Sequence, residues 1–286
     1  MTQQPLRPFS IHMFLLDGTP DGIKIIEKSN WIGKAVAFPR GRFADLRRRK
    51  EFGNTGVYVL VGEAGTEALP TIYVGEGDPV ADRLTSHYKQ KDFWSNAVFF
   101  TSKDENLNKA HVQYLESRLI ATAKEAKRCI LDNGNVPQAP SLSEMDVADM
   151  EVFLDQMLLV FGVLGIGVFQ KPSAATSSTE LLYLNAKGLK AVGYEVDDGF
   201  VVQAGSQSPR EHVPSTPEPI VRLRQTLLSQ GVFVEEKGCW KMALDYTFSS
   251  LSTAAAVLLA RSANGRIEWK DAQGRTFGAI QEARVG

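Results

Sequence analysis

Short apolar runs separated by turn sequences dominate the first hundred residues and predict β-strands. The opening runs SIHMFLL and IKIIEK flank DGTPDG, whose Asp-Gly steps favour tight turns, and together they predict a β-hairpin. The runs GVYVLV and TIYVG flank the connection EAGTEALP and predict two further strands. The run AVFFT, at residues 97–101, predicts another strand.

Helical spacing begins at residue 80. Residues 80–89 predict a first helix, and residues 108–128 predict a longer second helix. At about 100° per residue, Glu116 lies within about 60° of four apolar residues of the second helix, namely Val112, Leu119, Ile120 and Ala123. The pattern places a carboxylate on the predicted buried face, which is unfavourable unless a cation or several donors meet it. Glu116 is therefore a candidate functional residue.

The second half of the chain predicts a helical segment followed by a separate unit. Ser141 and Glu144 have the spacing of a capping box, which predicts a helix that continues to about Phe161. The apolar run from Met157 to Phe169 is interrupted by glycines and is shorter than the ~18–20 residues of a membrane span, so it is predicted to lie in the core. After the stretch KPSAATSSTE the chain predicts mixed strands and helices, with RIEWK and RTFG as a final hairpin.

Composition narrows the functional classes. The 286 residues include 32 Lys and Arg against 33 Asp and Glu, so the chain is not uniformly basic and any phosphate binding must come from a local patch. Cys129 and Cys239 lack a CxxC or Cys/His cluster, which argues against a zinc site or a disulfide framework and favours a reducing compartment. The N-terminus lacks the pattern of a signal peptide. We therefore expect a cytoplasmic protein without a membrane segment.

Five side chains of the central region suit phosphodiester hydrolysis. This reaction needs an activated water or hydroxyl, positive charge near the phosphate oxygens and help for the leaving oxygen. Phenols, a guanidinium and a hard cation held by a carboxylate can meet these needs. The five residues are Tyr58, Tyr73, Arg83, His87 and Glu116. Because no cluster of cysteines or histidines is present, Mg²⁺ or Mn²⁺ is expected rather than zinc.

Residues 56 to about 135 resemble the GIY-YIG endonuclease family. The two motifs that name the family correspond to Gly56-Val57-Tyr58 and Tyr73-Val74-Gly75, with valine in place of isoleucine in both. The other candidate residues follow in the family's order, on the two predicted helices. The resemblance implies cleavage of nucleic acid with a divalent metal.

The resemblance also implies a role for each residue. Glu116 would hold the metal, Tyr58 would act as or position the general base, and Tyr73 would support the water network. Arg83 would contact the scissile phosphate. His87 would assist through hydrogen bonding or proton transfer.

An asparagine after the metal helix often completes the family's site, and Asn133 is the expected match, with Asn135 as the alternative. The implied fold class is α+β, with a small mixed β-sheet flanked by helices and a second, smaller α+β domain. That C-terminal part resembles an uncharacterised domain that accompanies such nucleases. The expected segments are an N-terminal β-hairpin and basic extension (1–50), the nuclease-like domain (51–140), a helical extension (141–170), a linker (171–180) and the C-terminal α+β domain (181–286).

A basic stretch precedes the first tyrosine motif and, beside a phosphodiesterase site, predicts contact with the DNA backbone; a solvated helix face is the alternative. The predicted nucleic-acid-binding residues are Arg40, Arg42, Arg47, Arg48, Arg49, Lys50, Lys89 and Lys91, and the track could extend to Lys103 and Lys109. DNA is the expected partner. The alternative function is a non-catalytic nucleic-acid-binding or partner-binding protein on the same scaffold, with residues 181–286 providing a protein-partner or homo-oligomer contact.

Overall fold

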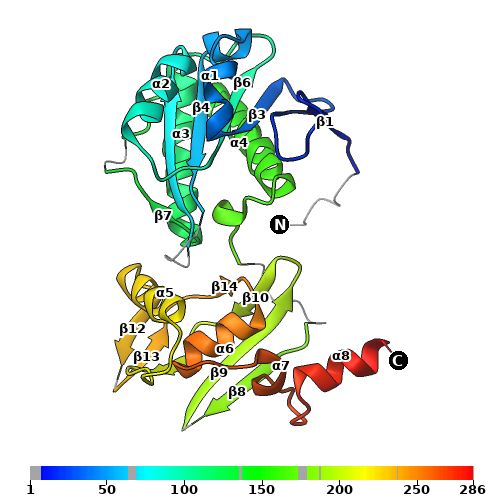
Figure 1. The fold of residues 1–286 in the computed structure, drawn as a ribbon, viewed down its shortest axis with the longest axis vertical. Coiled ribbons are helices and arrows are strands. Elements are labelled where there is room, and N and C mark those ends of the chain that lie inside the picture. Colours follow the sequence, from blue (N-terminus) through cyan, green and yellow to red (C-terminus); the bar gives the residue numbers. More distant parts are fainter. Residues whose placement is uncertain are drawn as a thin grey trace. The chain divides into compact units, whose positions relative to one another are not determined.

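Both parts of the chain combine helices and strands, which confirms the predicted α+β class (Figure 1). Contacts divide the chain into two compact units, one formed largely by residues up to Phe169 and the other largely by residues from Gln170 onwards. Most of the predicted linker lies outside the described residues. The computed structural model describes residues 8–63, 69–134, 137–172, 179–186, 188–236 and 238–285.

The first unit is built on one mixed sheet with the strand order β1-β2-β3-β6-β4-β5-β7. Its neighbouring strands pair antiparallel except β5 and β7, which are parallel. The predicted hairpin and the two tyrosine-bearing strands are confirmed, and the N-terminal hairpin belongs to the same sheet as the tyrosine motifs. The strands are β1 (Ile11–Leu15), β2 (Lys24–Lys28), β3 (Gly33–Pro39), β4 (Gly56–Val61), β5 (Thr71–Gly77), β6 (Asn96–Ser102) and β7 (Ile130–Leu131).

Strand β3 was not predicted, although it lies inside the sheet between β2 and β6. Its sequence GKAVAFP is buried on both faces over Ala35–Phe38. A strand that is covered on both sides does not alternate between polar and apolar residues, so its period of two is lost.

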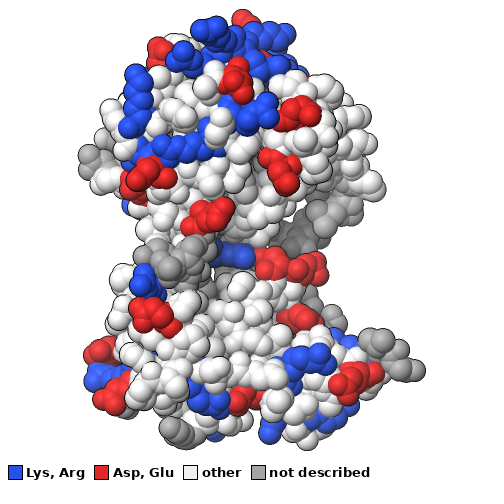
Figure 2. Space-filling view, viewed as in Figure 1, with Lys and Arg blue, Asp and Glu red and all other residues white. Residues whose placement is uncertain are grey.

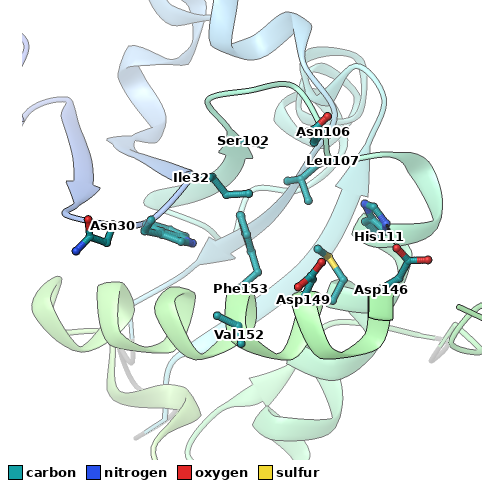
Figure 3. A pocket seen from close by; sticks show the side chains of 12 residues that line it. Asn30, Ile32, Ser102, Asn106, Leu107, His111, Asp146, Asp149, Val152 and Phe153 are labelled. Atoms are coloured by element: carbon teal, nitrogen blue, oxygen red, sulfur yellow. Dashed lines mark ion pairs between the residues drawn. The ribbon is translucent and has the colours of Figure 1, made fainter. Parts of the chain in front are cut away.

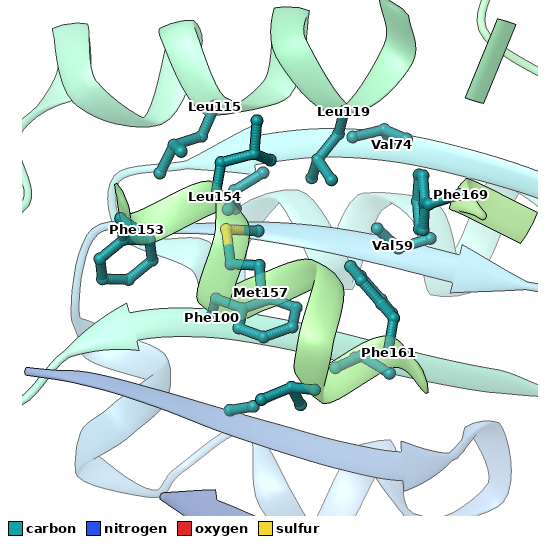
Figure 4. Close-up of a cluster of buried hydrophobic side chains, with 14 of the residues drawn as sticks. Val59, Val74, Phe100, Leu115, Leu119, Phe153, Leu154, Met157, Phe161 and Phe169 are labelled. Carbon is teal, nitrogen blue, oxygen red and sulfur yellow. The ribbon is translucent and has the colours of Figure 1, made fainter. Parts of the chain in front are cut away.

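Two hydrophobic clusters cover the two faces of this sheet. On one face, α3 (Lys109–Ala126), α4 (Glu144–Val163) and η4 (Gly167–Phe169) pack against the strands. Figure 4 shows side chains from this face, among them Val59, Val74 and Phe100 from the strands, Leu115 and Leu119 from α3, and Met157, Phe161 and Phe169. The apolar run ending at Phe169 is therefore part of the core, as predicted. In the described parts of the chain, no helix is long and apolar enough to cross a membrane.

The opposite face is covered by α2 (Val80–Gln90) and by the basic stretch, which folds into η1 (Arg40–Arg42), α1 (Phe43–Leu46) and η2 (Lys50–Gly53). Phe43, Leu46 and Phe52 from this stretch are buried against the sheet. Because these apolar residues anchor the segment, the arginines between them are held on a defined surface.

The start of α4 differs from the prediction. Ser143, not Ser141, is the N-cap, and its Oγ accepts a hydrogen bond from the backbone N–H of Asp146 at 3.1 Å. The spacing of the pair is that of the predicted capping box, displaced by two residues. Both serines precede an acid three residues later in the chain, so the sequence alone did not separate them.

The second unit contains a four-stranded sheet, ordered β14-β10-β9-β8, and a three-stranded sheet, ordered β11-β13-β12. The strands of the larger sheet are β8 (Leu182–Ala186), β9 (Leu189–Val196), β10 (Gly199–Val202) and β14 (Tyr246–Phe248). Those of the smaller sheet are β11 (Gln207–Pro209), β12 (Phe233–Glu236) and β13 (Cys239–Met242). The helices are α5 (Glu218–Ser229), α6 (Leu251–Leu259), α7 (Gly265–Glu268) and α8 (Phe277–Val285).

The predicted final hairpin is reduced to one antiparallel bridge between Lys270 and Thr276, because RIEWK lies mostly in α7 and RTFG leads into α8. Asn264 caps α7 by accepting a hydrogen bond from the N–H of Arg266 at 3.1 Å, which favours a helical turn at this point. Trp269 is then fully buried, and its Nε1 donates to the carbonyl of Leu251 at 3.0 Å. Burial of this indole against α6 overrides the local β-propensity of the segment.

Candidate active site

The two motif tyrosines lie on neighbouring antiparallel strands. In the register of β4 and β5, Tyr58 is directly opposite Gly75 and Leu60 is opposite Tyr73. Both phenol rings lie on the α2 face of the sheet, with ring centroids 6.3 Å apart and 29° between their planes. Tyr58 is fully buried, whereas Tyr73 is half-buried. The strand pairing thus stacks two phenols that are fifteen positions apart in the sequence.

Gly75 makes room for the Tyr58 phenol. A Cβ atom on Gly75 would lie 2.4 Å from the Oη of Tyr58 and 2.9 Å from Cε1 of Tyr73. Real Cβ atoms do not approach other atoms so closely, so any other residue at this position would displace a phenol. The glycine of the second motif is therefore needed for the position of the tyrosine of the first.

Helix α2 brings an imidazole to the two phenols. Val80 and Leu84 are fully buried on the inner side of α2, and His87 follows one turn later on that side with only 7% of its surface exposed. The His87 ring centroid is 4.6 Å from that of Tyr73 and 5.8 Å from that of Tyr58. Neither ring nitrogen has a hydrogen-bond partner among the described residues. Such buried, unpaired nitrogens are uncommon in a structural core.

Burial keeps the imidazole and both phenols neutral. The pKa of His87 falls to about 4 because of burial and, to a smaller extent, because of the positive charges of Arg83 and Lys91. Burial also raises the pKa of Tyr58 and of Tyr73. Arg83 opposes this rise, but no hydrogen bond of regular geometry reaches the buried Oη of Tyr58. At neutral pH the phenols are hydrogen-bond donors and not phenolates.

Glu116 lies at the margin of the buried stripe of α3. The four apolar residues that were predicted beside it are at most 1% exposed, while Glu116 itself is half-buried. Its carboxylate has no hydrogen bond or ion pair with any described residue. Burial and the nearby charge of Glu76 raise its pKa to about 7, against the opposing effects of Arg83 and Lys109. A cation beside this carboxylate would offset both the cost of burying the charge and the repulsion from Glu76.

The site forms where strand β5 is open on its outer side. On that side β7 pairs only with Thr71 and Ile72, and no other described strand pairs with β5 there; β4 occupies the inner side. Beyond the effect of burial, Glu116 adds to the raised pKa of both phenols, and Arg83 opposes the raised pKa of Glu116. Arg83 is exposed on α2, and α3 carries Glu116 on the other face of the sheet. Tyr58, Tyr73 and His87 therefore lie together, and the electrostatic interactions indicate that Arg83 and Glu116 lie near them around the edge of β5.

Asn133 has a structural contact at this edge. Its side chain accepts a hydrogen bond from the Val74 N–H at 3.0 Å and donates one to the Val74 carbonyl at 2.7 Å. The amide thus continues the pairing of β7 with β5 and holds the residue between Tyr73 and Gly75. The catalytic role of Asn133 stays a prediction, and the contact indicates a positioning role. The alternative match, Asn135, lies outside the described residues.

Two residues of the site were not predicted in it. Glu76 follows the second motif directly and faces α3, with 14% of its side chain exposed. The Nζ of Lys109, at the start of α3, lies 2.8 Å and 2.7 Å from the two carboxylate oxygens of Glu76. Lys109 precedes Glu116 by two helical turns, so the two residues share a face of α3. This spacing could have indicated from the sequence that Lys109 belongs to the site of Glu116 and not to the basic residues predicted to contact DNA.

The donors at this site fit a hard divalent cation. Within the described ranges, no three His, Cys, Asp or Glu side chains gather around a common point, so a closed zinc-like cage is not formed there. The site offers the carboxylate of Glu116, with that of Glu76 near it and an open side toward solvent. Mg²⁺ and Mn²⁺ are bound in this way, by one or two carboxylates together with waters and substrate phosphate oxygens.

Half of the predicted nucleic-acid-binding residues already have partners. Arg40 donates to the Tyr88 carbonyl at 3.0 Å and lies over the rings of Tyr88 and Trp94. The ion pairs of the others are Arg42 with Asp17 at 2.8 Å, Arg49 with Glu51 at 3.0 Å, and Lys91 with Asp132 at 2.5 Å. These contacts fix local structure and reduce the charge that each residue presents to a ligand.

Four other residues of the predicted set are exposed, and their side chains have no hydrogen bond or ion pair among the residues that the structure describes. They are Arg47, Arg48, Lys50 and Lys89. In Figure 2, lysine and arginine side chains gather at the end of the first unit where Figure 1 places α1 and α2. This surface is the local basic patch that a phosphate backbone requires.

A separate pocket of about 360 Å³ lies on the α4 side of the first unit. Its wall contains Ile32, Val152 and Phe153, and His111 lies beside Asp146 at one end, with His111 Nε2 3.6 Å from Asp146 Oδ1 (Figure 3). None of the predicted site residues lines it. The candidate active site is therefore an open edge of the sheet and not this cavity.

Comparisons with known proteins address the second unit. Residues 182–281 match DUF4357, a domain of unknown function. No curated protein matches the chain significantly. No solved structure does so either. A functional argument for the first unit therefore depends on its sequence motifs and on the geometry described above.

Proposed function

We propose that the first unit is a metal-dependent endonuclease of the GIY-YIG type, which hydrolyses phosphodiester bonds in DNA. One observation carries this proposal: among the described residues, neither nitrogen of the buried His87 ring has a hydrogen-bond partner, and the buried Oη of Tyr58 interacts with Arg83 without a hydrogen bond of regular geometry. Arg83 is exposed beside them, and Glu116 has no ion pair with a described residue. Leaving buried polar groups unpaired destabilises a fold, and such groups are concentrated at sites that bind substrate or water. The set includes the donors, the acceptor and the charges that phosphodiester hydrolysis needs.

The environment of each residue in the structure supports a role. Arg83, exposed and permanently charged, binds a non-bridging oxygen of the scissile phosphate. Tyr58 and Tyr73 are neutral phenols that hold the attacking water, and neutral His87 offers an acceptor nitrogen for its proton. Glu116 would hold Mg²⁺ or Mn²⁺, which supplies positive charge for the leaving oxygen when bound.

The basic patch supports DNA as the substrate. Arg47, Arg48, Lys50 and Lys89 are exposed on the α1 and α2 side, which is the side of the sheet where Arg83 and the phenols lie. Contacts from these residues to backbone phosphates would orient a duplex without reading its sequence. Selection of a target or a protein partner would then belong to residues 181–286.

The test is a plasmid cleavage assay with Mg²⁺ or Mn²⁺, with EDTA as the metal-free reference. Glu116→Gln should lower the cleavage rate about 100-fold or more, because a charged group at the reaction centre is lost. Tyr58→Phe should also slow cleavage, since it removes only the hydroxyl. Glu125→Gln is the matched control, because Glu125 is an exposed acid on the same helix.

Equal cutting by the parent, Glu116→Gln and Tyr58→Phe would refute the assigned roles. DNA binding without metal-dependent cleavage, unchanged in Glu116→Gln, would instead support a non-catalytic nucleic-acid-binding module. These two results are separable, because binding is measured by an electrophoretic shift and cleavage by the appearance of nicked or linear plasmid.

A further inference from the structure

The ion pair between Glu76 and Lys109 lies inside the proposed active site. Glu76 is on β5, three residues after Tyr73, and Lys109 is the first residue of α3. The Glu76 side chain is largely buried, while that of Lys109 is 52% exposed. Lys109 is thus a solvent-accessible cation that neutralises a carboxylate with little access to water.

Glu76 and Glu116 belong to one electrostatic site. The side chains of β5 alternate between faces, so Glu76 points away from the tyrosine face and toward α3, where Lys109 meets it. Lys109 and Glu116 lie on the same face of α3, two turns apart. Glu76 also acts on the guanidinium of Arg83. Glu76 therefore interacts electrostatically with both of the charged groups that the proposed function uses, Arg83 and Glu116.

The two carboxylates differ in their partners. Lys109 pairs with Glu76, whereas Glu116 has no ion pair among the described residues, and the charge of Arg83 acts on both acids. A divalent cation that bound both carboxylates would neutralise both acids. It would also release Lys109, whose flexible stem could then carry its charge to a phosphate of the substrate.

We propose that Glu76 is a second carboxylate of the Glu116 cation site, and that the Lys109 ammonium is a resident counter-ion which an incoming divalent cation displaces. This inference rests on the proposed function, because it assigns further residues to the same site. The cation binds in competition with Lys109. Removal of the lysine charge therefore strengthens cation binding, whereas removal of the Glu76 charge weakens it.

The test measures Mn²⁺ binding directly by electron paramagnetic resonance, in which free hexaaqua Mn²⁺ gives the signal. Glu76→Gln should raise the Kd for Mn²⁺ about tenfold, as expected for a removed partner of a metal site. Lys109→Met keeps the length of the side chain and should lower the Kd several-fold, since a competing charge is lost. In the double variant, Lys109→Met should no longer lower the Kd for Mn²⁺. Without the Glu76 carboxylate, Lys109 has no group for which it competes with the cation.

Lys103→Met is the matched control, because Lys103 also pairs with an acid of the sheet, Glu27, at 3.7 Å. It should leave the Kd for Mn²⁺ unchanged. Thermal unfolding of every variant checks that the fold is retained, and selective acetylation gives a second measurement. Mn²⁺ should increase the acetylation rate of Lys109, as read by mass spectrometry, and leave that of Lys103 unchanged.

The outcomes separate this inference from the proposed function. If Mn²⁺ affinity is unchanged in Glu76→Gln and in Lys109→Met, the pair is a structural ion pair and the inference is overturned, even if cleavage depends on Glu116. If no Mn²⁺ binds to the parent protein, the inference is also overturned. If the affinities change as stated but no DNA is cleaved, the cation site stands and the nuclease function falls.

Discussion

His87→Phe tests whether the buried imidazole lowers the stability of the fold while it serves the proposed reaction. Phenylalanine keeps an aromatic ring against Tyr58 and Tyr73 and removes two buried nitrogens that have no partner. Since a buried unpaired polar atom costs about 1–3 kcal/mol, and the larger ring offsets part of the gain, we expect the variant to be about 1 kcal/mol more stable at pH 7.5. Its DNA cleavage should nevertheless fall, because the acceptor nitrogen is lost.

The same substitution should remove an acid-sensitive component of stability. The folded pKa of His87 is about 4, below the ordinary histidine value of 6.5. Below pH 6.5 the imidazole therefore binds a proton in the unfolded chain and stays unprotonated in the folded protein until the pH approaches 4. Stability is therefore lost as the pH falls. The loss attributable to His87 is about 2 kcal/mol at pH 5 and about 3 kcal/mol at pH 4. At pH 7.5 the contribution is close to zero.

Urea unfolding at pH 7.5, 6, 5 and 4, followed by tryptophan fluorescence, measures this effect as the difference between variant and parent. The second unit is unchanged, so its contribution cancels in that difference. His12→Gln is the control, because His12 is exposed on β1. A variant that is destabilised at pH 7.5 and keeps the acid sensitivity of the parent would refute the reasoning.

Three further predictions address other parts of the chain. Gly75→Ala should lower the free energy of unfolding by about 1–3 kcal/mol and abolish cleavage, because the new methyl group displaces the Tyr58 phenol. A circular-dichroism melt measures the first effect and the plasmid assay the second. Full activity would contradict the steric argument. Asn133→Ala should cost about 1–3 kcal/mol in urea unfolding by leaving two backbone groups of β5 unpaired, and an unchanged midpoint would show that water replaces the amide. A variant with alanine at Arg47, Arg48 and Lys50 should bind all duplex sequences more weakly. The dependence of log Kd on log salt concentration should become shallower by about 0.9 per lost phosphate contact. An unchanged dependence would show that these side chains are only solvated.

Local patterns predicted the elements that carry the site. The helices that became α2 and α3 were identified from residue spacing, because one face of each is buried and the other is not. The strands that became β4 and β5 were identified from the β-propensity of their valine, isoleucine and tyrosine residues. Strand β3 was missed because burial on both faces removes the alternation and because most of its residues, Gly, Lys, Ala and Pro, have low β-propensity. Strand β4 is also buried on both faces, but its valines and tyrosine favour a strand. The final hairpin is reduced to one bridge, between Lys270 and Thr276, because a helix cap and the burial of Trp269 outweighed local propensity.

In the candidate site, local sequence patterns likewise predicted some side chains and missed others. Motif order was enough to nominate the two tyrosines, the arginine, the histidine and Glu116. The neighbouring pair of Glu76 and Lys109 was not assigned to the site, because the two residues are 33 positions apart and only the packing of α3 on β5 joins them. Likewise, no local signal separated Lys91, which is paired with Asp132, from the exposed Lys89.

The sequence by itself determined which chemical groups are present, their order, and the local elements that carry them, since these depend on covalent order and on short-range periodicity. Tertiary structure alone decided which of these groups are neutral, which are paired and which remain open to a ligand. The charge state of His87 or Glu116 depends on burial and on charges that reach it from other elements. Those distances are set by strand register and helix packing, which no short stretch of sequence contains.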